Sequence, residues 1–129
     1  MLLARLVLLF SGAAFVLYGI ACAFDPTVAA NIIGFDLTNS QLRIEVIAMY
    51  GGLQTALGVI FLYCGLRTEW LLPGLSLTAV CFLCLAVGRT TGIILHGSDA
   101  YNFPTSIYES VTALLAIVAI LLVRKSAQN

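Results

Sequence analysis

The stretch WLLPGLSLTAVCFLCLAVGRTTGIIL, from Trp70 to Leu95, decides the fold of this chain. It contains a single charged side chain, Arg89, among residues that are otherwise almost entirely apolar. A helix needs about 20 apolar residues to cross a ~30 Å hydrocarbon core, and this run is longer than that. An arginine inside such a helix is costly unless a partner answers its charge. The stretch therefore predicts a transmembrane helix with a polar contact near Arg89.

The composition of the whole chain extends this prediction. The chain has 129 residues, of which 61% are hydrophobic and 9% charged, whereas about a quarter of the residues in a soluble domain are charged. We predict an all-α membrane protein, with a single domain over residues 1–129 that forms a four-transmembrane-helix bundle in the lipid bilayer. The predicted spans are residues 4–24, 43–66, 70–95 and 106–124.

The first apolar run could be mistaken for a secretory signal peptide. Arg5 precedes it, and Ala21-Cys22-Ala23 resembles a cleavage site. The uncharged core from Leu6 to Phe24 is longer than the ~7–15 residues typical of a signal peptide. We therefore expect this run to be a membrane span.

The basic residues predict how the chain is oriented. Lysine and arginine near span ends are enriched on the cytoplasmic side, so we expect both termini to be cytoplasmic in a cell membrane, such as a bacterial inner membrane. The first outer loop begins with Asp25-Pro26, a helix-start signal, and has Gly34 as a stop signal. We predict a short interfacial helix there, with an extended loop as the alternative. The basic residues placed on the cytoplasmic side are Arg5, Arg67, Arg124 and Lys125.

Glycines recur every seven residues within the spans. This spacing lets membrane helices approach closely, so we expect the glycines to lie between helices. The motif Gly88-x-x-x-Gly92 could also form a homo-oligomer, although packing within one chain is favoured. The periodic glycines are Gly12, Gly19, Gly51, Gly58, Gly65, Gly74 and Gly88, with Cys81 midway between the last two.

Three charged residues are predicted to lie at similar depth, near the outer boundary. Glu45 shares a helix face with Ala48, Gly52 and Ala56, and Glu109 shares one with Thr112, Ala113 and Ala116. Such small-residue faces are typical of helix contacts, and an arginine can bridge two carboxylates. We therefore predict a cluster of Glu45, Arg89 and Glu109, with Tyr50, His96 and Tyr108 within reach.

Other interpretations of these charges stay open. Ser106-x-x-Glu109 matches a capping box, in which Glu109 would only bind amides at a helix start. Arg89 could extend into the headgroups, and Glu45 could lie in water. If the cluster forms, a structural role is favoured over an outward pocket that binds or transports a small ligand, lipid, quinone, proton or cation.

The motifs give no support for an enzyme. We find no nucleophile–base pair, phosphate-binding loop or metal-ligand spacing, so we expect no catalytic residue, metal or other cofactor. The net charge of zero gives no indication of nucleic-acid binding. Cys81 and Cys84 have the spacing of a redox pair, but two packed helix cysteines are favoured. We predict a non-enzymatic membrane component.

Several short motifs resemble one known family. They are Glu45-x-x-x-x-Tyr50-Gly51-Gly52-Leu53-x-x-x-x-Gly58, Gly88-Arg89-x-x-Gly92 and a glutamate, Glu109, that opens the last helix. Together they resemble the bacterial four-helix membrane family DUF4345 and, more loosely, DoxX-like proteins. The resemblance implies the four-helix fold and no assigned activity. The family often has an arginine three residues before the tyrosine, where this chain has Ile47, and Arg43 is the nearest substitute.

Overall fold

The computed structural model describes residues 1–128, and every regular element among them is helical. A π-helix, η1, joins α3 to α4, and a 3-10 turn, η2, precedes α5. The predicted all-α class is confirmed. The elements are α1 (Leu2–Phe24), α2 (Thr27–Ile33), α3 (Ser40–Val46), η1 (Ile47–Leu53), α4 (Gln54–Leu66), η2 (Thr68–Trp70), α5 (Leu71–His96) and α6 (Asn102–Gln128).

Four helical stretches are long and apolar enough to cross a membrane. They are Leu2–Phe24, Ser40–Leu66, Thr68–His96 and Asn102–Ser126. The prediction of four long apolar helices is confirmed, and each stretch extends beyond the predicted span by one to four residues at one or both ends. The helices continue past the apolar runs because polar residues at their ends can still form backbone hydrogen bonds in the interface.

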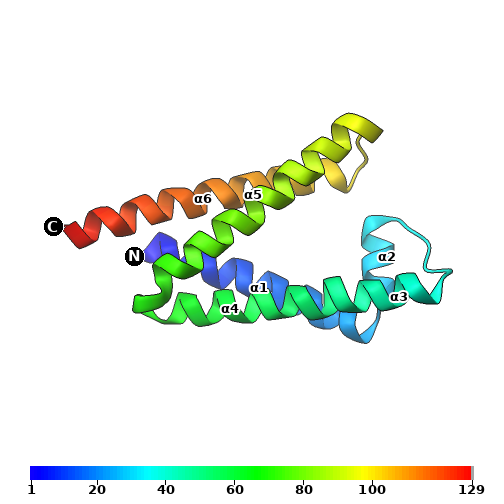
Figure 1. Ribbon diagram of the computed structural model, residues 1–129, viewed down its shortest axis with the longest axis horizontal. Coiled ribbons are helices and arrows are strands. Elements are labelled where there is room, and N and C mark those ends of the chain that lie inside the picture. Colours follow the sequence, from blue (N-terminus) through cyan, green and yellow to red (C-terminus); the bar gives the residue numbers. More distant parts are fainter. Residues whose placement is uncertain (129) are drawn as a thin grey trace.

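The helices are arranged as two antiparallel pairs (Figure 1). α1 packs along η1 and α4, and α5 packs along α6, with fewer contacts between the two pairs. Both termini lie at one end of the molecule, and the pairs diverge toward the other end. We call this second end the loop end, because it carries α2 and the connection between α5 and α6.

Glycines allow the close approach of α1 and α4. A Cβ built on Gly58 would lie 2.7 Å from the backbone nitrogen of Val16 and 2.8 Å from the carbonyl oxygen of Gly12. The expected role of the periodic glycines holds for this interface. It is wrong for Gly88, whose Cβ would meet no atom within 4 Å, because the two pairs diverge toward this end of α5 (Figure 1).

Aromatic rings join the two pairs below the point where they diverge. The ring centroid of Phe15 on α1 lies 5.8 Å from that of Phe61 on α4 and 5.3 Å from that of Phe82 on α5. All three side chains are buried. Lipid tails are as apolar as these side chains, so the hydrophobic effect does not drive membrane helices together. Tight packing of the rings therefore contributes much of the attraction between the pairs.

The short helix predicted in the first long loop is present as α2. Asp25 begins it by accepting hydrogen bonds from the backbone nitrogen (2.9 Å) and hydroxyl (2.6 Å) of Thr27. These bonds lower the pKa of Asp25. Gly34 ends the helix with φ of 87°, a conformation that favours glycine. The extended-loop alternative is therefore wrong.

The π-helix η1 was not predicted. It replaces α geometry between Ile47 and Leu53, within the second span. Gly51, inside η1, packs against Ala23 of α1, where a Cβ would lie 2.9 Å from the Ala23 Cα. Apolar periodicity over one and a half turns does not distinguish π from α geometry, which explains the missed element.

Candidate functional site

A bidentate ion pair joins α5 to α6 near the loop end. Arg89 donates from Nε to Oε2 of Glu109 at 2.8 Å and from Nη2 to Oε1 at 2.7 Å. Glu109 is buried, with 3% of its surface exposed. The planar guanidinium matches the carboxylate in both bonds, so the pair fixes the register of the two helices.

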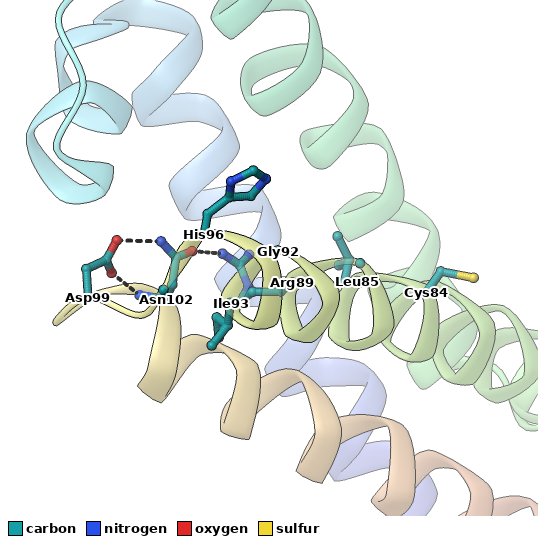
Figure 2. A pocket seen from close by; sticks show the side chains of 10 residues that line it. Cys84, Leu85, Arg89, Gly92, Ile93, His96, Asp99 and Asn102 are labelled. Carbon is teal, nitrogen blue, oxygen red and sulfur yellow. Dashed lines mark hydrogen bonds between the residues drawn. The ribbon is translucent and has the colours of Figure 1, made fainter.

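Two residues that sequence reasoning missed complete this contact. Arg89 Nη1 donates to Asn102 Oδ1 at 2.8 Å, and Asn102 Nδ2 donates to Asp99 Oδ2 at 2.7 Å. Figure 2 shows this line from Arg89 through Asn102 to Asp99. The signal that could have found them is an aspartate three residues before the asparagine at a helix start.

Asp99 also begins α6. Its Oδ1 accepts hydrogen bonds from the backbone nitrogens of Asn102 (2.6 Å) and Tyr101 (2.9 Å). The capping-box interpretation of Ser106 and Glu109 is therefore wrong, because α6 starts one turn before Ser106. Ser106 Oγ lies 3.0 Å from Thr90 Oγ1 instead.

These hydrogen bonds predict a pH dependence. The hydrogen bonds from Asn102 hold the pKa of Asp99 below the ordinary value of 3.8, and the bond from the backbone nitrogen has the largest effect. A carboxylate whose pKa is lowered by folding stabilises the fold at pH values above its unfolded-state pKa. This stabilisation is lost as the pH falls through the folded-state pKa. We expect Asp99→Ala to lower the thermal stability at pH 7, and the difference from wild type to shrink below about pH 4. Melting curves in detergent from pH 3 to pH 7 measure this, and a constant difference down to pH 3 would contradict it.

Tyr101 lies against the same guanidinium. Its ring centroid is 5.6 Å from Arg89 Cζ, within the range of a cation–π contact. Burial raises the pKa of Tyr101, and the positive charge of Arg89 opposes that rise. The ring therefore shields one side of the guanidinium from solvent.

Glu45 is not part of this arrangement. Its side chain is exposed, and it forms no ion pair with any residue that the structure describes. The face that it shares with Ala48, Gly52 and Ala56 is exposed as well, whereas the corresponding face of Glu109 is buried. The prediction that Glu45 belongs to a cluster with Arg89 and Glu109 is therefore wrong.

The other three predicted residues have different surroundings. Tyr50 is half-buried and packs edge-on against Tyr18, with ring centroids 6.3 Å apart. Tyr108 packs edge-on against Phe82 at 5.8 Å, so its ring belongs to the contact between α5 and α6. His96 is exposed at the end of α5 and lines the pocket described next.

A pocket of about 590 Å³ opens beside Arg89. It follows α5 toward the loop end and reaches the start of α6 (Figure 2). Apolar groups and bare glycine backbone line the part nearer the middle of α5, and polar groups line the loop end. The lining residues are Cys84, Leu85, Gly88, Arg89, Gly92, Ile93, His96, Gly97, Asp99 and Asn102.

Cys81 and Cys84 are both free thiols. Cys81 is half-buried and Cys84 exposed on α5. No group of three or more histidine, cysteine or acidic side chains could hold a metal ion within residues 1–128. The redox hypothesis for these cysteines stays a prediction.

Four apolar helices with a polar cluster at one end define a small polytopic membrane protein. The chain belongs to the family described as Domain of unknown function (DUF4345), whose model matches residues 3–122. No curated protein and no solved structure gives a match.

Proposed function

We propose that this protein is a non-enzymatic membrane component that binds a small ligand in the pocket beside Arg89. One observation carries the proposal: an arginine held by Glu109 and Asn102 lines an open pocket of about 590 Å³. A cavity of this size matches ligand sites, which combine mostly apolar walls with a few placed polar groups. The ion pair would then have two roles, since it joins α5 to α6 and orients the arginine.

The proposed orientation places the pocket toward the outside of the cell. Arg5 Nη2 donates to Thr68 Oγ1 at 2.9 Å, so Arg5 lies beside the turn that carries Arg67. Arg124 and Lys125 follow near the end of α6, at the end where the two termini lie (Figure 1). This gathering of basic residues supports cytoplasmic termini and a loop end outside.

A glycine substitution tests the ligand proposal. Gly92 lines the pocket, and no atom lies within 4 Å of a Cβ built on it, so a leucine side chain there can extend into the pocket. We expect native mass spectra after mild extraction to show a retained ligand on wild type and to lack it on Gly92→Leu. Gly52→Leu is the matched control, because Gly52 also lies in a membrane span, has no atom nearer than 3.8 Å to an added Cβ, and lies outside the pocket. Equal adducts on all three proteins would contradict the proposal.

Self-association is the second candidate function for the same surface. The observation that favours it is that both glycines of Gly88-x-x-x-Gly92 have open space where a Cβ would lie. A second copy packed there would use the close approach typical of this motif. The same mass spectra report subunit number, and a dimer that disappears in Gly92→Leu would favour this candidate over a bound ligand.

A further inference from the structure

The hydrogen-bonding groups at the polar end of the pocket indicate which ligand it takes. Arg89 has five N–H donors, and three of them bind Glu109 and Asn102. The other two donors, one on each Nη, have no hydrogen-bond partner among the described residues, and Arg89 lines the pocket. Arg89 therefore has hydrogen-bond donors available for a ligand.

The neighbouring acceptors each have at least one hydrogen-bond partner already. Both carboxylate oxygens of Glu109 accept from Arg89, and both carboxylate oxygens of Asp99 accept from Asn102 or its backbone. The side-chain oxygen of Asn102 accepts from Arg89 and its nitrogen donates to Asp99. Because an unpaired donor in apolar surroundings is costly, the pocket favours a ligand that offers oxygen acceptors.

The charges at this end disfavour an anionic ligand. Arg89 is balanced by Glu109, and Asp99 adds a further negative charge, so the three side chains carry a net charge of −1. An anionic ligand would bring a second unbalanced negative charge next to that of Asp99. A carbonyl oxygen accepts the same hydrogen bonds from Arg89 without that cost.

The shape of the pocket indicates an amphiphile. Its lining on α5 runs from Cys84 to His96, about 18 Å of helix at 1.5 Å per residue. This distance is more than half of a ~30 Å hydrocarbon core. The part near Cys84 is apolar, and two glycines, Gly88 and Gly92, leave the helix backbone open to an elongated chain.

We propose that the pocket binds a neutral amphiphile through a carbonyl oxygen, which accepts hydrogen bonds from Arg89 while the apolar chain lies over Gly88 and Gly92. This inference rests on the proposed binding function and specifies its ligand class. The carbonyl could belong to the ester of a glycerolipid or to a quinone. Both sources present the same chemistry to the guanidinium, so the experiment has an arm for each.

The test compares four probes: dioleoylglycerol and decylubiquinone carry neutral carbonyl groups, whereas oleic acid and oleylamine carry a charged polar end. Purified full-length protein is titrated with dioleoylglycerol, decylubiquinone, oleic acid and oleylamine, and native mass spectrometry measures the bound fraction. We expect at least one neutral carbonyl probe to bind about tenfold more tightly than oleylamine, which offers donors where the pocket needs acceptors. Oleic acid, measured at pH 8, should bind more weakly than that neutral probe. The better of the two neutral probes identifies the source of the carbonyl.

Variants separate the two proposals. If the ligand class is right, Gly92→Leu abolishes binding of the neutral probe and Gly52→Leu retains it. If oleic acid or oleylamine binds most tightly and Gly92→Leu abolishes that binding, the ligand class is overturned and the binding function stands. If Gly92→Leu changes neither the binding of any probe nor the amount of retained ligand, both proposals are overturned.

Discussion

Arg89→Leu is expected to lower the free energy of unfolding in detergent by about 3 kcal/mol, because it leaves a charged partner buried and unpaired. Only 5% of the Glu109 side chain is exposed, so its carboxylate cannot reach solvent without opening the contact between α5 and α6. Asn102 loses its hydrogen bond to Arg89 as well. Equilibrium unfolding of the purified protein, followed by helical circular dichroism, measures the loss.

The structure specifies which second substitution should rescue this variant. Glu109→Gln removes the unpaired charge, so the double variant Arg89→Leu/Glu109→Gln should recover part of the lost stability. Glu45→Gln is the matched control, since Glu45 is exposed and outside the ion pair. Equal rescue by both glutamines, or no loss for Arg89→Leu, would show that the pair does not stabilise the fold.

Arg89→Leu and Glu109→Gln, each made alone, should also differ in how much stability they cost. About 21% of the Arg89 side chain is exposed, compared with 5% of Glu109. An unpaired arginine near the loop end can extend toward water or headgroups, whereas an unpaired Glu109 cannot. Glu109→Gln alone should therefore cost less than Arg89→Leu.

Gly58→Ala is expected to destabilise the pairing of α1 with α4 by about 1–3 kcal/mol. The added Cβ would lie 2.7 Å from the Val16 backbone nitrogen, and backbone cannot move aside as a flexible side chain can. The helices must separate, which weakens packing along the whole interface because membrane helices depend on close contact. Thermal unfolding in detergent, at matched protein and detergent concentrations, reports the change.

Gly88→Ala is the control for this substitution. It makes the same chemical change in a membrane helix, but no atom lies within 4 Å of the added Cβ. We expect its stability to stay within about 1 kcal/mol of wild type, since alanine has the better intrinsic helix propensity. A similar loss in both variants would mean that glycine is required for a reason other than close helix approach.

Much of the fold could be predicted from local properties of the sequence. The apolar run around Leu75 is long enough to cross a membrane whatever it packs against, so the spans follow from counting residues. Asp25 and Gly34 bound α2 through their own backbone and side-chain chemistry. Such signals act within a few residues and need no knowledge of the partner helix.

The partner of Arg89 depended on tertiary structure. Glu45 and Glu109 have the same residue type, similar predicted depth and small residues on the same helix face, so their local patterns are equivalent. Packing distinguishes them: α6 lies along α5, while the face of Glu45 has no partner in the described chain. Asn102 reaches Arg89 for the same reason, because the connection from α5 to α6 folds back over that contact, and Asp99 binds Asn102 there.

The sequence by itself therefore determined a four-helix membrane protein with costly charges near one end, because hydrophobic length and charge are properties of the chain. Only the tertiary structure decided that Arg89 binds Glu109 and Asn102, that Glu45 stays apart, and that the glycines at 88 and 92 border a pocket. The physical reason is that periodicity places a residue on a helix face, whereas the packing of the helices decides what that face meets.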